Sequence, residues 1–195
     1  MNNKYQISRV FCSMSVFIAL LLTTQAYAYS YSEAGKEPLI EGREALIGAL
    51  LANDQKEAEQ ALVLMHGELS QLEGSMSIAL IKPLKEAVSK GQRGATIKLM
   101  NKTFAAEIKH RLNQAEANIN DYQKSKILVA KSKLFLGTII VELDDDEAEL
   151  AQEAINTCLK ALGNPGVFGA GKEPVNLEQF KVEKKVLFES LQTFE

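Results

Sequence analysis

The sequence predicts an all-α protein, a bundle of six or seven helices that follows a cleaved signal peptide. Three observations lead to this prediction. After residue 38, apolar residues recur at spacings of three and four, which is the spacing of one face of an α-helix. Alanine, leucine, glutamate and lysine are abundant, and these residues favour helices. No convincing strand pattern interrupts the run of helical segments.

The first 28 residues have the pattern of a secretory signal peptide. Lys4 and Arg9 form a basic start, an apolar run covers residues 10–22, and the triplet 26–28 is the small-residue cleavage site Ala-Tyr-Ala. A membrane-spanning helix needs about 20 apolar residues, and this run is shorter. We therefore expect the segment to be removed after export and not to remain as an anchor.

The mature chain, residues 29–195, is predicted to be a single helical domain in the periplasm or in the extracellular medium. We expect no membrane span in it, because no later stretch is long and apolar enough. Loss of Lys4 and Arg9 changes the formal net charge from −3 to −5, which excludes the basic footprint of a nucleic-acid-binding protein. Cys158 is then the one remaining cysteine, so the fold must hold by packing without a disulfide.

The first predicted helices have recognisable starts. Pro38 suits the first turn of a helix, because its missing N–H would have no partner there. Asp54, with Glu57 three residues later, is the pattern of a capped helix start, and we expect that helix to end at Gly74. Pro83 must either kink the next segment or start a new helix within it.

The longest periodic stretch covers residues 95–141, and it could be one helix or two. We favour two helices with a break around residues 118–120, because average globular helices are much shorter than this stretch. Asp144 and the acidic residues after it predict the start of the next helix. A last helix is expected over residues 177–191.

Glutamates near the start of the first helix suggest a metal site. Glu37, Glu41 and Glu44 follow each other at spacings of four and three, so we expect them on one helix face. Stacked carboxylates could bind a hard cation or iron, and His66 is a possible further ligand. The alternative is that these residues form the solvated face of an amphipathic helix.

The same region carries a resemblance to a known family. Residues 36–46, Lys-Glu-Pro-Leu-Ile-Glu-Gly-Arg-Glu-Ala-Leu, resemble the helical extracytoplasmic regions that accompany bacterial high-affinity iron permeases. Those permeases carry Arg-Glu-Gly-Leu-Glu in their membrane helices, whereas here residues 43–46 are followed by Ile47, so the second glutamate is missing. The resemblance covers about a dozen residues. It implies metal handling, with a membrane transporter as a partner.

We expect the protein not to be an enzyme, and no cofactor is identifiable. The chain has two histidines, His66 and His110, and neither is flanked by a nucleophile motif. Covalent haem needs Cys-x-x-Cys-His, which is absent. Glu107 and His110 have the spacing of a di-iron ligand pair, but a second such pair is missing.

Two functional hypotheses follow. The first is an exported helical binding protein that handles iron or another metal ion in a transport system. The second is a protein–protein interaction or adaptor module of the cell envelope. It would bind through an exposed helix face or through the two loops that share the sequence Ala-Gly-Lys-Glu-Pro, residues 34–38 and 170–174. A contiguous apolar surface patch would favour the second hypothesis, and an inward cluster of carboxylates would favour the first. A basic cluster on one helix is either a solvated surface or a docking surface for a partner: Lys124, Lys126, Lys131 and Lys133.

Overall fold

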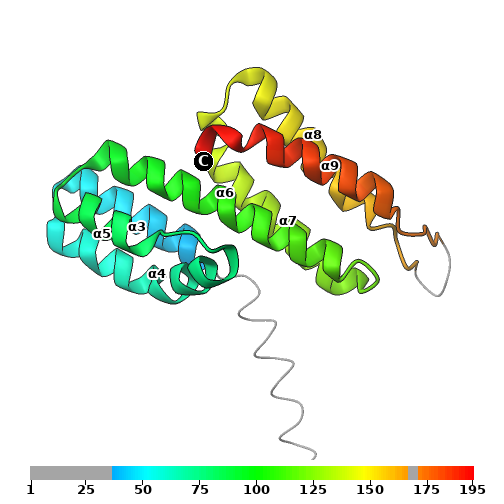
Figure 1. Cartoon of the computed structure of the whole chain (residues 1–195), viewed down its shortest axis with the longest axis horizontal. Coiled ribbons are helices and arrows are strands. Elements are labelled where there is room, and N and C mark those ends of the chain that lie inside the picture. The colour runs from blue at the N-terminus through cyan, green and yellow to red at the C-terminus, as the bar shows by residue number, and fades with distance from the viewer. Residues whose placement is uncertain (1–36, 167–170) are drawn as a thin grey trace, which may run out of the picture. The chain divides into compact units, whose positions relative to one another are not determined.

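The structure is a computed structural model that describes residues 37–166 and 171–195 (Figure 1). Residues Leu39–Glu195 belong to one compact unit. The described residues of this unit are all-helical, which confirms the predicted fold class, and they form no strand beyond one isolated bridge between Asn164 and Glu173. None of the helices in these ranges has the length and hydropathy needed to cross a bilayer. The predicted signal peptide and its cleavage site lie outside the described residues.

Seven α-helices and two short 3-10 helices, labelled as in Figure 1, make up the described ranges. The α-helices are α3 Pro38–Ala52, α4 Gln55–Met76, α5 Ile81–Ser89, α6 Arg93–Ala117, α7 Tyr122–Ile139, α8 Asp145–Ala161 and α9 Leu177–Ser190. The 3-10 helices are η1 Ile140–Glu142 and η2 Gln192–Phe194.

Helix α6 is the central element of the bundle. It packs against α4, α5, α7 and α9, while α7 also packs against α8, and α8 lies alongside α9 (Figure 1). The core side chains of α6 include Phe104, whose ring meets that of Phe135 on α7 edge to face, with the centroids 4.9 Å apart. This geometry is favourable for aromatic pairs, because the positive ring edge faces the negative ring face.

The helices α3 and α4 approach each other closely at Gly42. A Cβ atom added there would lie 2.1 Å from Cγ and 2.6 Å from Sδ of Met65, which is fully buried. No real Cβ atom could occupy that position without moving the methionine. Glycine at position 42 therefore allows the close contact between the two helices.

Polar contacts also tie the C-terminal helices to α6. Lys109 on α6 donates to the Glu195 carboxylate, and its ammonium group lies 5.7 Å from the ring centroid of Phe188 on α9. These contacts join residues that are far apart in the sequence, 86 positions in the case of Lys109 and Glu195. The C-terminal part of the chain thus packs against the middle of the sequence.

Two of the predicted helix starts are confirmed in detail. The Asp54 side chain accepts a hydrogen bond from the Glu57 backbone N–H at 2.9 Å, and Asp144 accepts one from Glu147 at 2.8 Å. Each satisfies one of the four backbone N–H groups that a helix start leaves without a partner. The predicted break into two helices is also confirmed, because α6 ends at Ala117 and α7 begins at Tyr122.

The predicted end of α4 at Gly74 is wrong, since the helix continues to Met76. The left-handed residue that ends it is Ser77, with φ 54°, and Gly74 lies within the helix. Pro83 does start a new helix, because it is in the first turn of α5, where its missing N–H costs nothing. The carboxylate of Glu73 accepts the backbone N–H groups of Leu80 at 2.5 Å and Ile81 at 2.7 Å at this helix start.

Candidate functional site

The predicted metal ligands differ in their surroundings. Glu41 and Glu44 are exposed on α3, and His66 is exposed on α4. Glu37 is only 7% exposed and precedes α3, which begins at Pro38, so the expectation of one shared helix face does not hold for it. Residues 37–166 and 171–195 contain no group of three or more His, Cys, Asp or Glu side chains that could hold a metal ion. A metal-binding role for these four residues stays a prediction.

Arg43 lies beside these glutamates and faces the core. Its guanidinium carbon is 5.7 Å from the ring centroid of Phe104. Burial lowers the pKa of Arg43 from its usual value, and the negative charges of Glu142 and Glu44 act in the opposite direction. Glu44 therefore contributes to the electrostatic compensation of a half-buried cation.

His66 lines a groove between α4 and α5, which we call the α4–α5 groove. It has a volume of about 350 Å³, and its apolar part comes from Leu62 and Val63. Polar side chains complete the lining: Glu59, His66, Lys85 and Ser89. His66 thus has apolar neighbours and a lysine close by, a setting that suits contact with a partner better than ligation of a cation.

Helix α7 has two apolar faces, and one of them is open. Val129, Phe135 and Ile139 are buried in the core, as the apolar periodicity predicts. Ile127 and Leu134 belong to the same predicted periodic stretch, yet they are 49% and 57% exposed.

Further exposed residues continue the open face at spacings of three and four. We call the complete set the α7 stripe: Ile127, Ala130, Leu134 and Gly137 on α7, and Val141, 79% exposed, on η1. Four of these residues lie on one solvent-facing side of α7, and Val141 follows them in η1, after the α-helix ends at Ile139. Other large aliphatic side chains are also exposed, such as Val63 and Leu64 on α4. The α7 stripe differs from them in having exposed lysines on both sides, and apolar surface with a polar rim is a candidate interaction site.

Lysines flank the α7 stripe on both sides. Lys126 and Lys133 lie on one side of it and Lys124 on the other, and all three are exposed. Lys131 occupies the matching position one heptad after Lys124 and is half-buried. The predicted basic cluster is therefore divided in two by an apolar row, a division that becomes visible only when the buried face of α7 is known.

The contacts of the exposed lysines are with neutral groups. The ammonium groups of Lys124 and Lys133 donate to the side-chain oxygens of Asn118 and Asn156, each at 2.7 Å. Lys126 lies 5.3 Å from the ring centroid of Tyr122. Because none of these partners carries a negative charge, the positive charges on both sides of the α7 stripe remain available to a charged ligand.

Cys158 is a buried structural thiol, as the sequence predicts. It is fully buried on α8, and its Sγ lies 3.8 Å from the backbone oxygen of Phe180 on α9. Burial, and secondarily the negative charge of Glu183, raises the pKa of Cys158 to about 12. A thiol of this kind stays protonated at neutral pH and is a poor nucleophile.

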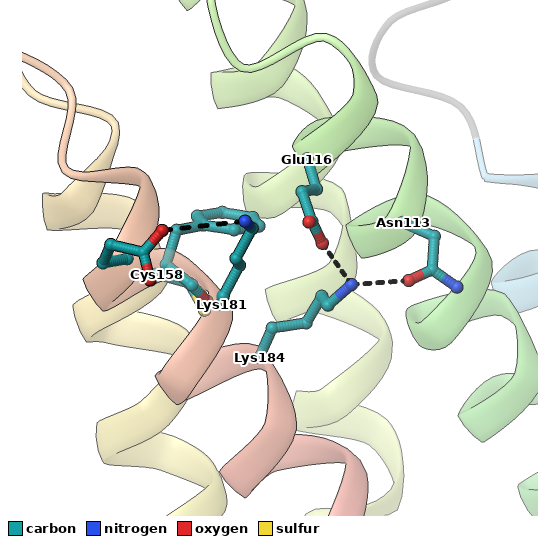
Figure 2. A network of polar contacts seen from close by, with 7 residues as sticks. Asn113, Glu116, Cys158, Lys181 and Lys184 are labelled. Atoms are coloured by element: carbon teal, nitrogen blue, oxygen red, sulfur yellow. Dashed lines mark hydrogen bonds and ion pairs between the residues drawn. The ribbon is translucent and has the colours of Figure 1, made fainter.

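Lys184 on α9 joins this helix to α6. Figure 2 shows Lys184 reaching between Asn113 and Glu116, and its ammonium group donates to both side chains, at 2.8 Å in the case of Asn113. Lys181, one turn earlier on α9, pairs with Glu178 at 3.7 Å (Figure 2). The Lys184 contacts hold α9 against α6, whereas the Lys181–Glu178 pair lies within α9.

The residues with di-iron spacing have other contacts. Glu107 is paired with Arg111 at 2.5 Å, and a ring nitrogen of His110 is 2.8 Å from the Gln114 side chain. Arg111 also lies over the ring of Phe135, 4.9 Å from the centroid. The Glu107–Arg111 ion pair therefore supports the packing of α6 against α7, and His110 has its contact within α6.

Comparisons of the chain with protein-family models, with curated proteins and with solved structures found no match. The function must therefore be inferred from the site itself. Two surface features are candidates for a functional site, the α4–α5 groove and the α7 stripe with its lysines. Both are suited to contact with another molecule.

Proposed function

We propose that the protein is an exported interaction module of the cell envelope, which binds another protein through the α7 stripe. The observation that carries this proposal is the exposure of Ile127, Leu134 and Val141 in one row on α7 and η1. Transfer of large aliphatic side chains out of water stabilises a complex by about 25 cal/mol for each Å² of apolar surface buried. A row of three with small residues between them gives a partner helix or loop a defined place to bind.

Two observations favour an interaction module over a metal-binding protein. A contiguous apolar row is the surface feature expected of an interaction module. A metal site would need several inward carboxylates or histidines, and no group of three exists in the described ranges. Export of the protein is supported by the signal-peptide pattern of residues 1–28.

The proposal is tested by a pair of matched substitutions. Leu134→Asp places a charge in the middle of the α7 stripe, and Val182→Asp places one at an equally exposed position, 59%, on α9. Both sites are solvated, so both variants should keep the helical circular dichroism and the melting temperature of the wild type. Proteins captured from the envelope fraction of the host should be lost with Leu134→Asp and retained with Val182→Asp. Capture that both variants retain would refute the proposal.

The export component has its own test. Expression of the whole chain in a Gram-negative host, followed by mass spectrometry of the protein in the periplasmic fraction, should give a chain that begins at Tyr29. An uncleaved chain in the cytoplasm would refute export and leave the interaction test unaffected.

The metal hypothesis is tested on the same preparation. Calorimetric titration with iron or another divalent metal, compared between the wild type and a Glu41→Gln/Glu44→Gln double variant, measures whether these carboxylates bind the ion. Micromolar binding that the double variant loses would favour the metal hypothesis over the interaction module.

A further inference from the structure

We infer that the partner of the α7 stripe is an amphipathic helix with carboxylates on both sides of its own apolar face. This inference rests on the proposed function and adds the chemistry of the partner to it.

The spacing of the α7 stripe is that of a coiled coil. Its four positions on α7 are separated by three, four and three residues, so they correspond to positions a and d of a heptad. Ile127 and Leu134 are at position a, and Ala130 and Gly137 are at position d. Val141 comes next in sequence at the same spacing, on the 3-10 helix η1 that follows α7. A strict a/d row is narrower than the apolar face that a helix buries in a globular core, and it matches the contact surface of a single helix.

The small residues at position d leave room for the side chains of a partner. A Cβ atom added at Gly137 would have no neighbour within 4 Å in the described structure, so the protein's own packing does not require glycine there. Two helices approach more closely where the contact residues are small. The alternation of aliphatic and small residues thus provides projections and gaps for knobs-into-holes packing.

The flanking lysines select the charge of the partner. Lys124 is at position e, and Lys126 and Lys133 are at position g, the positions that face the flanks of a partner helix in a coiled coil. Their present contacts are with the neutral groups Asn118, Tyr122 and Asn156. A partner with glutamate or aspartate at its own flanking positions would place carboxylates beside all three ammonium groups, and a partner with lysines would be repelled.

The same lysines argue against a second copy of this chain as the occupant. In a parallel pair, position g of one helix faces position e of the other, and in an antiparallel pair like positions face each other. Both arrangements would bring lysine next to lysine. The α7 stripe is therefore unsuited to self-association, although its apolar row alone would allow it.

An anionic membrane surface is the other ligand that lysines beside an apolar row could attract. Helices that lie in a bilayer interface carry a broad apolar face, often with aromatic residues. The α7 stripe is a narrow row of three aliphatic side chains without an aromatic residue. A helix is the better fit, and a membrane is an outcome that the experiment must detect.

The experiment measures binding of the full chain to two synthetic peptides of about four heptads. Both peptides carry leucine at positions a and d. The acidic peptide has glutamate at e and g, and the basic peptide has lysine there, so each is discouraged from pairing with itself. Fluorescence anisotropy at low salt should show at least tenfold tighter binding of the acidic peptide, and the preference should weaken as salt is added.

Charge reversal provides the decisive comparison. Lys124→Glu, Lys126→Glu and Lys133→Glu together should reverse the preference, so that the basic peptide binds more tightly. The matched control reverses three exposed lysines outside both the α7 stripe and the α4–α5 groove, Lys82, Lys90 and Lys98, and it should keep the wild-type preference. Equal affinity for the two peptides, or no binding of either, would overturn the inference.

The outcomes separate this inference from the proposed function. If Leu134→Asp abolishes binding but charge reversal has no effect, the α7 stripe binds proteins and the inferred charge of the partner is wrong. If Leu134→Asp leaves peptide binding and envelope capture unchanged, the proposed function itself fails. Binding to vesicles that contain phosphatidylglycerol, lost on charge reversal, would replace the partner helix by a membrane surface and overturn the inference. A wild-type dimer that Leu134→Asp dissociates, measured by analytical ultracentrifugation, would also overturn it.

Discussion

The contact between α3 and α4 makes a quantitative prediction about two glycines of the same helix. Gly42 and Gly48 both lie within α3, but only Gly42 has a neighbour in the way of a Cβ atom, Met65, at 2.1 Å. At Gly48 a Cβ atom would have no neighbour within 4 Å. Alanine at either position gains the same helix propensity, about 1 kcal/mol. The difference between the two variants therefore isolates the packing at position 42.

The size of that difference follows from the buried neighbour. Met65 is fully buried, and the obstructing atoms include Cγ near the base of its side chain. The side chain must therefore change its rotamer or the helices must move apart, and overpacking of this kind costs about 1–3 kcal/mol. We expect Gly48→Ala to stabilise the protein by about 1 kcal/mol. Gly42→Ala should be less stable than Gly48→Ala by about 1–3 kcal/mol.

Urea denaturation followed by circular dichroism measures both free energies of unfolding. A Met65→Ala substitution, which alone costs about 2–5 kcal/mol, completes a double-mutant cycle. The cost of Gly42→Ala should disappear in the Met65→Ala background, because the clashing atoms are gone. Equal stabilisation by Gly42→Ala and Gly48→Ala would show that the two helices do not approach as closely as described, and the argument would be refuted.

Three further predictions concern polar groups. Hydrogen bonds from the Leu80 and Ile81 backbones lower the pKa of Glu73 below 4.5. The stabilising effect of this carboxylate is therefore complete above pH 4.5 and is lost as the pH falls through the lowered pKa. Glu73→Ala should lower the melting temperature at pH 7, and the difference from the wild type should shrink as the pH is lowered step by step below 4.5. A difference that does not depend on pH would contradict this. Burial raises the pKa of Cys158 to about 12. In a folded Cys12→Ser variant at pH 8, this thiol should therefore resist a disulfide reagent, and it should react once urea unfolds the protein. Fast reaction of the folded protein would show that the thiol is accessible. Lys184→Met should lower the free energy of unfolding, measured by urea denaturation, by about 1–2 kcal/mol. The matched variant Lys181→Met removes a more exposed lysine and should cost less than about 0.5 kcal/mol. Equal costs would contradict the role of the Asn113 and Glu116 contacts.

Local sequence signals predicted the helices well. The caps at Asp54 and Asp144 depend on residues three positions apart, so the chain carries the whole signal within one turn. The break after Ala117 was predicted from length alone. The end of α4 was not predicted, because the left-handed turn uses Ser77 where a glycine was expected. The contact of Gly42 with Met65 joins separate helices, and no local pattern contains it.

The functional surface was harder to predict than the fold. Helix α7 has apolar residues on two faces, and periodicity alone cannot decide which face is buried. Leu134 and Phe135 are neighbours in the sequence, and only the packing of α7 against α6 and α8 buries one and exposes the other. The candidate metal site depended on extending helical geometry to Glu37, one residue before the helix begins. The four flanking lysines were visible in the sequence, but their relation to the exposed row required the structure.

The contacts of α9 and the residues after it with α6 have a consequence for the order of folding. Neighbouring helices such as α6 and α7 meet through short connections, whereas Lys109 meets Glu195, and Asn113 meets Lys184, across 86 and 71 residues. Closing a long loop costs more entropy than closing a short one, so contacts of high sequence separation form slowly and late. Helix α9 packs mainly against its sequence neighbour α8, and α6 against its neighbour α7, so each of these pairs can form through a short connection before the long closure. Until that closure, the smaller surface through which α6 meets α9 and η2 stays open to water, and that surface is the part of the core most exposed to proteases and aggregation during folding.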